Sequence, residues 1–210
     1  MGKTKFNTCF FERYAMISLT TLLGDRYACL VNEDRPDLQA PDHSIGIEVT
    51  RAMEESKKVA DSLLMEMAGV VDPDDDDEAE NDYRSIIDSG YGYGLRGGKY
   101  IGSVEYEYWA LALPLRRIIA SKIRKVSSGF YGSFRDFGLY IFCKDHLNED
   151  EVRLTVAYTA DLQKGLRTCY DTMYLSLIDR LYVCDMDSGE ISHSEITKEM
   201  CRTFFRQALK

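Results

Sequence analysis

The chain has 210 residues, of which 45% are hydrophobic and 29% charged, as is usual for a globular protein. This length suffices for one domain that needs neither disulfides nor a structural metal. No apolar run approaches the roughly 20 residues that cross a bilayer, and we expect no signal peptide at the N-terminus. The sequence therefore predicts a single cytoplasmic domain over residues 1–210, with no membrane partner.

The net charge of −9 comes almost entirely from one acidic run, DPDDDDEAEND at residues 72–82. This run holds eight acids and no base, so −9 less these eight charges leaves −1 for the remaining chain. Because the acidity is local, it does not exclude a polyanionic partner for the rest of the surface. The six cysteines form no CxxC pair, which favours reduced thiols over disulfides, and the three histidines lack the spacing of a zinc site.

The first part of the chain predicts a helix, three strands and a second helix. Apolar side chains recur at helical spacing over residues 9–24, and Gly24 is a natural end for that helix. Residues 27–31, 36–39 and 45–50 are predicted to be extended, and residues 53–68 carry apolar and charged side chains on opposite sides of a helix.

Residues 69–98 hold the acidic run and a glycine-rich segment, and we expect them to form a flexible excursion. The acidic run is either a disordered loop or an internal mimic of DNA. The letters of a dinucleotide-binding fingerprint occur at Gly92, Gly94 and Gly97, but no strand is predicted before them.

After Pro114 the sequence predicts an amphipathic helix, LRRIIASKIRKV. Residues 139–143, 173–177 and 181–185 are predicted strands, residues 151–162 fit helix or strand, and residues 194–208 are predicted to form a closing helix that begins with the capping pattern SEIT. This order gives an α/β fold with a mixed central sheet flanked by helices.

Two carboxylates stand out in the segment RPDLQAPDHSIGIEVTRA, from Arg35 to Ala52. Glu48 lies inside an apolar strand, where a buried carboxylate is costly unless it is paired or binds a metal. Asp37 belongs to a neighbouring extended segment, so the two carboxylates can converge at one sheet edge. Hard oxygen ligands of this kind suit Mg²⁺. In the alternative interpretation, Asp37 is a turn residue and Glu48 is exposed and paired with an arginine.

The order of a helix with Glu12, a strand, Pro36-Asp37 and then Ile47–Thr50 before a helix resembles the restriction-endonuclease-like superfamily, the PD-(D/E)XK nucleases. The resemblance covers about the first 70 residues and implies a restriction-endonuclease-like core. It further implies that Asp37, Glu48 and the Val49 carbonyl hold Mg (or Mn), with Glu12 as an auxiliary ligand.

One position departs from the family's pattern, since Thr50 stands where that pattern has lysine. The lysine supplies positive charge beside the attacking water and the scissile phosphate, whereas a threonine hydroxyl can only orient a water. Three interpretations stay open. A base from elsewhere (Lys122, Lys125 or Arg51) takes the lysine's place, the metal suffices alone in a slow enzyme, or the site is a degenerate remnant.

Six bases and no acid occur between Tyr108 and Arg135. We expect Arg116, Arg117, Arg124 and Lys125 to project from the helix after Pro114 and to contact nucleic acid, unless acids elsewhere balance them. Nearby aromatic residues either stack on bases or join the core; they are Trp109, Phe130, Tyr131 and Phe134.

The sequence thus predicts an Mg-dependent nucleic-acid phosphodiesterase, with DNA preferred over RNA and Asp37, Glu48, Thr50 and Lys122 as candidate catalytic residues. The alternative is a catalytically inactive nuclease-fold module that binds nucleic acid or a protein partner. Whether the chain forms a homodimer does not follow from the sequence.

Overall fold

The computed structural model describes residues 8–52, 95–96, 99–100, 114–143 and 147–210. In chain order, the elements of these ranges are α1 (Thr8–Leu23), the 3₁₀ turn η1 (Asp25–Tyr27), β1 (Val31–Asn32), β2 (Leu38–Gln39), β3 (Ile45–Arg51), β4 (Leu95–Arg96), β5 (Lys99–Tyr100), α5 (Pro114–Ser127), β6 (Asp136–Phe142), α6 (Glu149–Gln163), β7 (Thr172–Ser176), β8 (Arg180–Asp185), β9 (Ile191–Glu195) and α7 (Lys198–Ala208).

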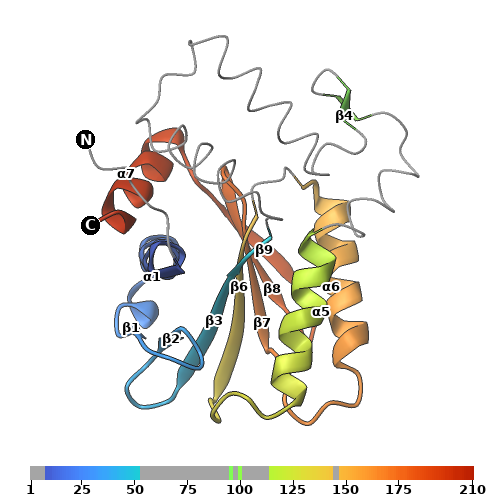
Figure 1. Ribbon diagram of the computed structural model, residues 1–210. Helices are drawn as coiled ribbons and strands as arrows, with labels where there is room; N and C mark the ends of the chain where they lie inside the picture. The colour runs from blue at the N-terminus through green and yellow to red at the C-terminus, as the bar shows by residue number, and fades with distance from the viewer. Residues whose placement is uncertain (1–7, 53–94, 97–98, 101–113, 144–146) are drawn as a thin grey trace.

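Seven of the described strands form one mixed sheet in the order β1-β2-β3-β6-β7-β8-β9 (Figure 1). Strands β3, β6 and β7 are parallel, and the outer pairs on both sides are antiparallel. The described residues therefore confirm an α/β fold with a mixed central sheet.

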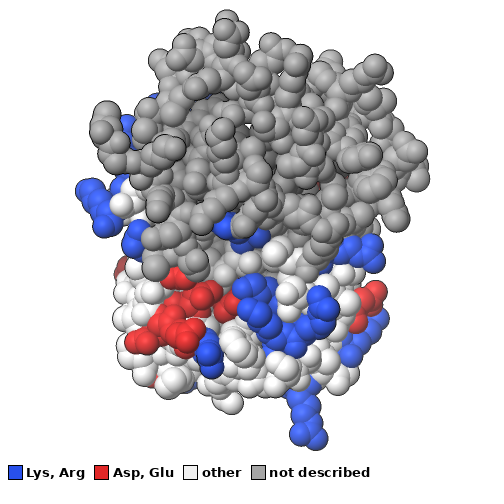
Figure 2. Space-filling model, viewed as in Figure 1, with Lys and Arg blue, Asp and Glu red and all other residues white. Residues whose placement is uncertain are grey.

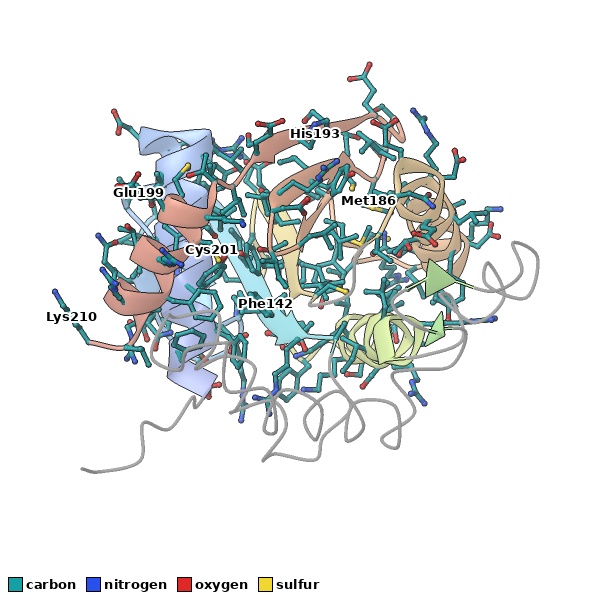
Figure 3. The ribbon with its side chains drawn as sticks, turned by 90° about the horizontal axis from the view of Figure 1, so that it is seen from above. Phe142, Met186, His193, Glu199, Cys201 and Lys210 are labelled. Carbon is teal, nitrogen blue, oxygen red and sulfur yellow. The ribbon has the colours of Figure 1, made fainter. Side chains whose placement is uncertain are left out.

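The helices cover the two faces of this sheet in pairs. Helices α1 and α7 lie on one face, and α5 and α6 lie on the other (Figure 1; seen from above in Figure 3). Within β3, Ile47 and Val49 pack toward α1, whereas Ala52, just after the strand, belongs to the core beneath α5 and α6. Strand alternation thus turns Glu48 and Thr50 away from α1 and toward the α5 face.

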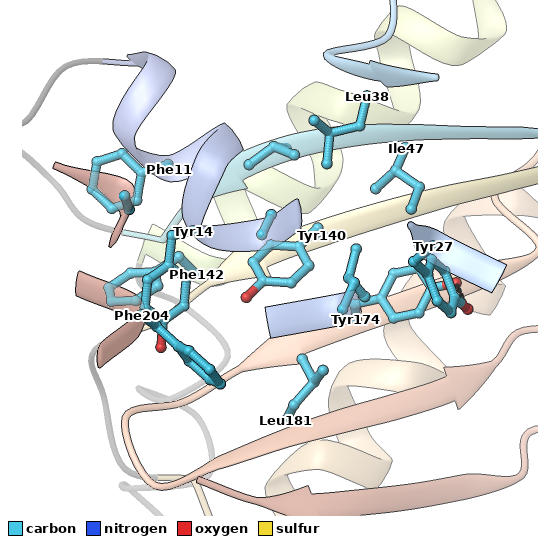
Figure 4. Close-up of a cluster of buried hydrophobic side chains, with 14 of the residues drawn as sticks. Phe11, Tyr14, Tyr27, Leu38, Ile47, Tyr140, Phe142, Tyr174, Leu181 and Phe204 are labelled. Atoms are coloured by element: carbon cyan, nitrogen blue, oxygen red, sulfur yellow. Dashed lines mark hydrogen bonds between the residues drawn. The ribbon is translucent and has the colours of Figure 1, made fainter. Parts of the chain in front are cut away.

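The core under α1 and α7 is mainly aromatic. The ring of Tyr14 packs edge-on against Phe142 and Phe205, at centroid distances of 5.3 and 5.1 Å (Figure 4 shows this cluster). A buried hydrogen bond of 2.8 Å joins the hydroxyls of Ser18 and Tyr140, so helix and sheet are linked by polar as well as apolar contacts. Such packing holds α1, and with it Glu12, in a fixed place beside the sheet.

The structure corrects two predicted elements. Residues 27–31 are not a strand, because residues 25–27 form a 3₁₀ turn and only Val31 of this segment belongs to β1. Tyr27 is buried for another reason, since its ring packs in the core and its hydroxyl lies 2.9 Å from that of Tyr174. The last helix begins at Lys198 rather than at residue 194, with the Thr197 side chain as its cap.

The predicted helix at 53–68, the acidic run and the glycines at 92, 94 and 97 lie outside the described residues. Residues 151–162, which fitted either type, are helical within α6. Among the described helices, none combines the length and apolarity that a bilayer crossing requires. The cysteines that are described, Cys29, Cys143, Cys169, Cys184 and Cys201, form no disulfide with one another.

Candidate functional site

Asp37, the residue just before β2, lies opposite Glu48 of β3 in the antiparallel register of the two strands. Strand β2 pairs with β3 so that Leu38 lies opposite Ile47, which places Asp37, one residue earlier, opposite Glu48. Facing residues of an antiparallel pair share one side of the sheet, with Cβ atoms about 5 Å apart. The arrangement therefore brings the two carboxylates to one sheet edge, as the sequence predicted.

The Asp37 carboxylate is fixed by the backbone of the neighbouring strand. Its Oδ2 atom accepts a hydrogen bond of 2.7 Å from the Val49 N–H, and within the described part of the chain no other donor reaches it. Partial burial, followed by the negative charge of Glu48, raises the pKa of Asp37 to about 6, against the lowering effects of that hydrogen bond and of Lys122. This carboxylate is thus held in a site where negative charge is in excess.

Glu48 is buried at 5% exposure and is paired with a lysine from a distant part of the chain. The Lys122 Nζ atom, on α5, donates a hydrogen bond of 2.5 Å to Glu48 Oε1, and both side chains are largely shielded from water. The helix that covers this face of the sheet therefore delivers a positive charge to the carboxylate. Because 74 residues separate the two partners in sequence, no local pattern reveals which base does so.

Glu12 extends the site from the other side. This residue of α1 is 7% exposed, and its Oε2 atom accepts a hydrogen bond of 2.5 Å from the side-chain amide of Asn32. The same amide also donates to the Asp37 carbonyl at 3.3 Å. The negative charge of Glu12 contributes to the raised pKa of Asp37, so the three acids act on one region.

Two tyrosines line the Glu48 side of the site. Burial and then the charge of Glu48 raise the pKa of Tyr131 well above its usual range. Burial, the neighbouring Tyr131 and Glu48 do the same to the pKa of Tyr170. A phenol is protonated at neutral pH even at its usual pKa, so both hydroxyl groups can act as hydrogen-bond donors.

A pocket of about 170 Å³ opens between α1, β3 and α5, and neither Asp37 nor Glu48 lines it. Its walls come from α1, β3 and α5 and consist of Phe11, Glu12, Val49, Thr50, Arg51 and Lys122. Thr50 is half-buried and shares this pocket with Lys122, so the position that holds lysine in the family's pattern and the lysine of α5 face the same space. Arg51 instead lies over the ring of Phe11, with its Cζ atom 5.2 Å from the centroid.

The other predicted bases of α5 lie at the surface. Arg124 and Lys125 are exposed, and Arg116 is exposed with its Cζ atom 4.7 Å from the ring centroid of Tyr158. Arg117 lies outside the residues whose side chains the structure describes. Figure 2 shows Lys and Arg side chains gathered over the region of α5, beside acidic side chains over the β1–β2 region. Charges of both signs thus flank the site.

The oxygen atoms at the site supply only part of the coordination shell of a hard cation. Within the described ranges, no set of three or more His, Cys, Asp or Glu side chains is placed to hold a metal ion. The available oxygens are the carboxylates of Asp37 and Glu48, the more distant Glu12 and main-chain carbonyls such as that of Val49. Mg²⁺ usually keeps several waters and takes only one or two protein carboxylates, so this donor set suits it better than a cation that needs a full protein cage.

Sequence reasoning missed Asn32 and Tyr170 and assigned Tyr131 only to stacking or core. Asn32 stands in a polar turn whose composition, NEDRPD, signals a loop and nothing more. Tyr170 precedes β7 and lies far beyond Glu48 in the chain, so no local pattern connects the two.

Comparison with protein-family models, curated proteins and solved structures finds no match to this chain.

Proposed function

We propose that this protein is a Mg²⁺-dependent phosphodiesterase that acts on DNA, built on a restriction-endonuclease-like core. One observation carries the proposal. The Lys122 ammonium lies 2.5 Å from Glu48 Oε1, and Lys122 and Thr50 both line the pocket between α1, β3 and α5. Lys122 would supply from α5 the positive charge that is missing two residues after Glu48, and Asp37 lies opposite Glu48 in the register of β2 and β3.

The order of the elements supports the same proposal. Helix α1 carries Glu12, strands β1 to β3 follow it, and β3 carries Glu48. Helix α5 then covers the face toward which Glu48 points. From α1 to β3 this order agrees with the arrangement on which the family resemblance rests, and the helix expected after β3 lies outside the described residues.

Each side chain has a defined task in such a reaction. Asp37, Glu48 and the Val49 carbonyl would hold the cation, with Glu12 as an additional ligand. The cation, when bound, would polarise the phosphate and make a coordinated water more acidic. Lys122 would stabilise the negative charge that develops on the phosphate, and the protonated Tyr131 hydroxyl would donate a hydrogen bond nearby.

A cleavage assay tests the proposal with purified full-length protein, plasmid and single-stranded DNA, and Mg²⁺ or Mn²⁺. We expect cleavage by the wild type that EDTA abolishes. Glu48→Gln should lower the rate by at least about a hundredfold, the scale seen when a charge-stabilising group is removed. The matched control is Glu195→Gln, the same change at an exposed position of β9. Full activity in Glu48→Gln would refute the site.

The buried ion pair of Lys122 and Glu48 also has the geometry of a purely structural salt bridge, and this favours a second function. The protein would then be a catalytically inactive module that binds nucleic acid or a protein partner. A ligand that binds only the folded state raises its stability with concentration. The enzyme should therefore gain thermal stability with Mn²⁺ and lose that gain in Glu48→Gln, whereas the module should respond to Mn²⁺ in neither form.

A further inference from the structure

The loop that follows α5 presents an exposed aromatic ring next to the candidate site. Phe130 is 42% exposed, one of the few large apolar side chains of the described residues at this level. Two cations from different segments lie near this ring: Arg35 Cζ is 4.8 Å and Lys125 Nζ is 5.4 Å from its centroid. Arg35, Lys125 and Phe130 together form the Phe130 patch.

Backbone geometry fixes the patch in place. Helix α5 ends in a Schellman motif, in which Gly129 has φ +71° and donates to the Val126 carbonyl at 3.1 Å, while the Phe130 N–H donates to the Lys125 carbonyl at 3.4 Å. In this motif the residue in the position of Phe130 usually packs against the one in the position of Lys125. Here that partner is a cation, and the ring stays largely open to solvent.

Two residues of the patch are close in sequence to residues of the candidate site. Arg35 precedes Asp37 by two residues, and Phe130 directly precedes Tyr131, whose hydroxyl lies beside Glu48. Short stretches of chain therefore connect the Phe130 patch to the residues around the two carboxylates. Arg35 also contacts Asp34 at 3.4 Å, but Asp34 is 87% exposed, so solvent screens that pair strongly.

We propose that the Phe130 patch binds an unpaired nucleotide, with its base on the Phe130 ring and its phosphates on Arg35 and Lys125. This inference rests on the proposed function and adds strand preference to it. An aromatic face stacks on any exposed base, whereas the bases of a duplex are already stacked on one another. A guanidinium also offers a flat surface and a phosphate-binding fork in one group. The protein should therefore prefer single-stranded over duplex DNA.

Binding in EDTA tests the patch without cleavage. Fluorescence anisotropy of the full-length protein would be measured with a labelled single strand, its RNA equivalent and a matched duplex. We expect tighter binding of the single strand, a loss of about tenfold in Phe130→Ala and recovery in Phe130→Trp. The matched control is Ile178→Ala, because Ile178 is a similarly exposed apolar side chain, at 36%, in the β7–β8 turn.

Charge variants complete the test. Arg35→Gln and Lys125→Gln should each reduce the slope of log affinity against log salt by about 0.7, and Lys164→Gln, an exposed lysine after α6, should leave it unchanged. Equal binding of single strand and duplex, or unchanged affinity in Phe130→Ala, overturns the inference. If the wild type cleaves DNA but the patch variants bind normally, the patch fails and the proposed function stands. If binding depends on Phe130 but no metal supports cleavage, only the catalytic proposal fails.

Discussion

The charged Asp37 carboxylate lowers the stability of the folded protein at neutral pH, which is unusual for a purely structural residue. Its folded-state pKa of about 6 exceeds the value of 3.8 for a free aspartate, so between these pH values the folded protein binds the extra proton. Stability therefore falls as pH rises through this window, and the loss is complete above about pH 6. A group that weakens the fold at neutral pH is expected where function requires it.

Asp37→Asn removes the charge but keeps an oxygen for the Val49 N–H. In EDTA, we expect this variant to be more stable than wild type by about 1 kcal/mol at pH 7.5, after allowance for solvent screening, and equal to it near pH 4. Urea unfolding across this range measures the difference. Asp42→Asn is the control with the opposite sign, because hydrogen bonds from Ser44 lower the pKa of Asp42. A less stable Asp37→Asn at pH 7.5 would contradict the description of the site.

Lys122 and Glu48 form a pair in which each side chain depends on the other. Lys122→Met leaves Glu48 buried without its counter-charge and should cost about 3 kcal/mol of unfolding free energy. The double variant Lys122→Met/Glu48→Leu should regain most of that loss, because apolar side chains replace both charges. Chemical denaturation of the two single variants and the double variant gives the coupling. Independent, additive effects would show that the two groups do not form a buried pair.

Among the elements, the end of α5 sets the position of the Phe130 patch. Gly129 adopts φ +71°, and a methyl group added at its Cα would meet no atom within 4 Å, so only backbone conformation opposes a side chain there. Gly129→Ala should lower stability by about 1 kcal/mol. Gly132→Ala is the control in the same loop, with no positive φ and only ordinary contact with Phe134. Thermal unfolding of both variants checks this, and equal stabilities would argue against the strained turn.

The elements that the sequence predicted well are those whose periodicity is strong, such as α1, β3 and α5. The failures have physical causes. Residues 27–31 have a strand-like composition, but Tyr27 belongs to a 3₁₀ turn. Its ring is buried there, and its hydroxyl forms a hydrogen bond with that of Tyr174. Strand β9 went unnoticed because ISHSE has no apolar alternation, and it is an edge strand whose stability comes from pairing with β8. The SEIT pattern predicted that the helix begins at Ser194, whereas the last residue of that pattern, Thr197, is the capping residue.

For the whole molecule, the sheet decides which distant residues meet. The register of β2 and β3 brings Asp37 opposite Glu48, and this could be anticipated because the two segments are close in sequence. The crossing of α5 over the sheet brings Lys122 to Glu48, and the approach to β7 brings Tyr170 to the same side. Those contacts depend on tertiary packing, so Lys122 could be named only as one of several candidate bases and Tyr170 could not be named at all.

We propose that Lys122 supplies from α5 the positive charge that the family's pattern places at position 50. The most direct measurement is the Mg²⁺-dependent cleavage rate of Lys122→Gln with and without Thr50→Lys, since both positions line one pocket. We predict a loss of at least about a hundredfold in Lys122→Gln and a substantial recovery in the double variant, with Lys164→Gln at the wild-type rate. Wild-type activity in Lys122→Gln would contradict the claim.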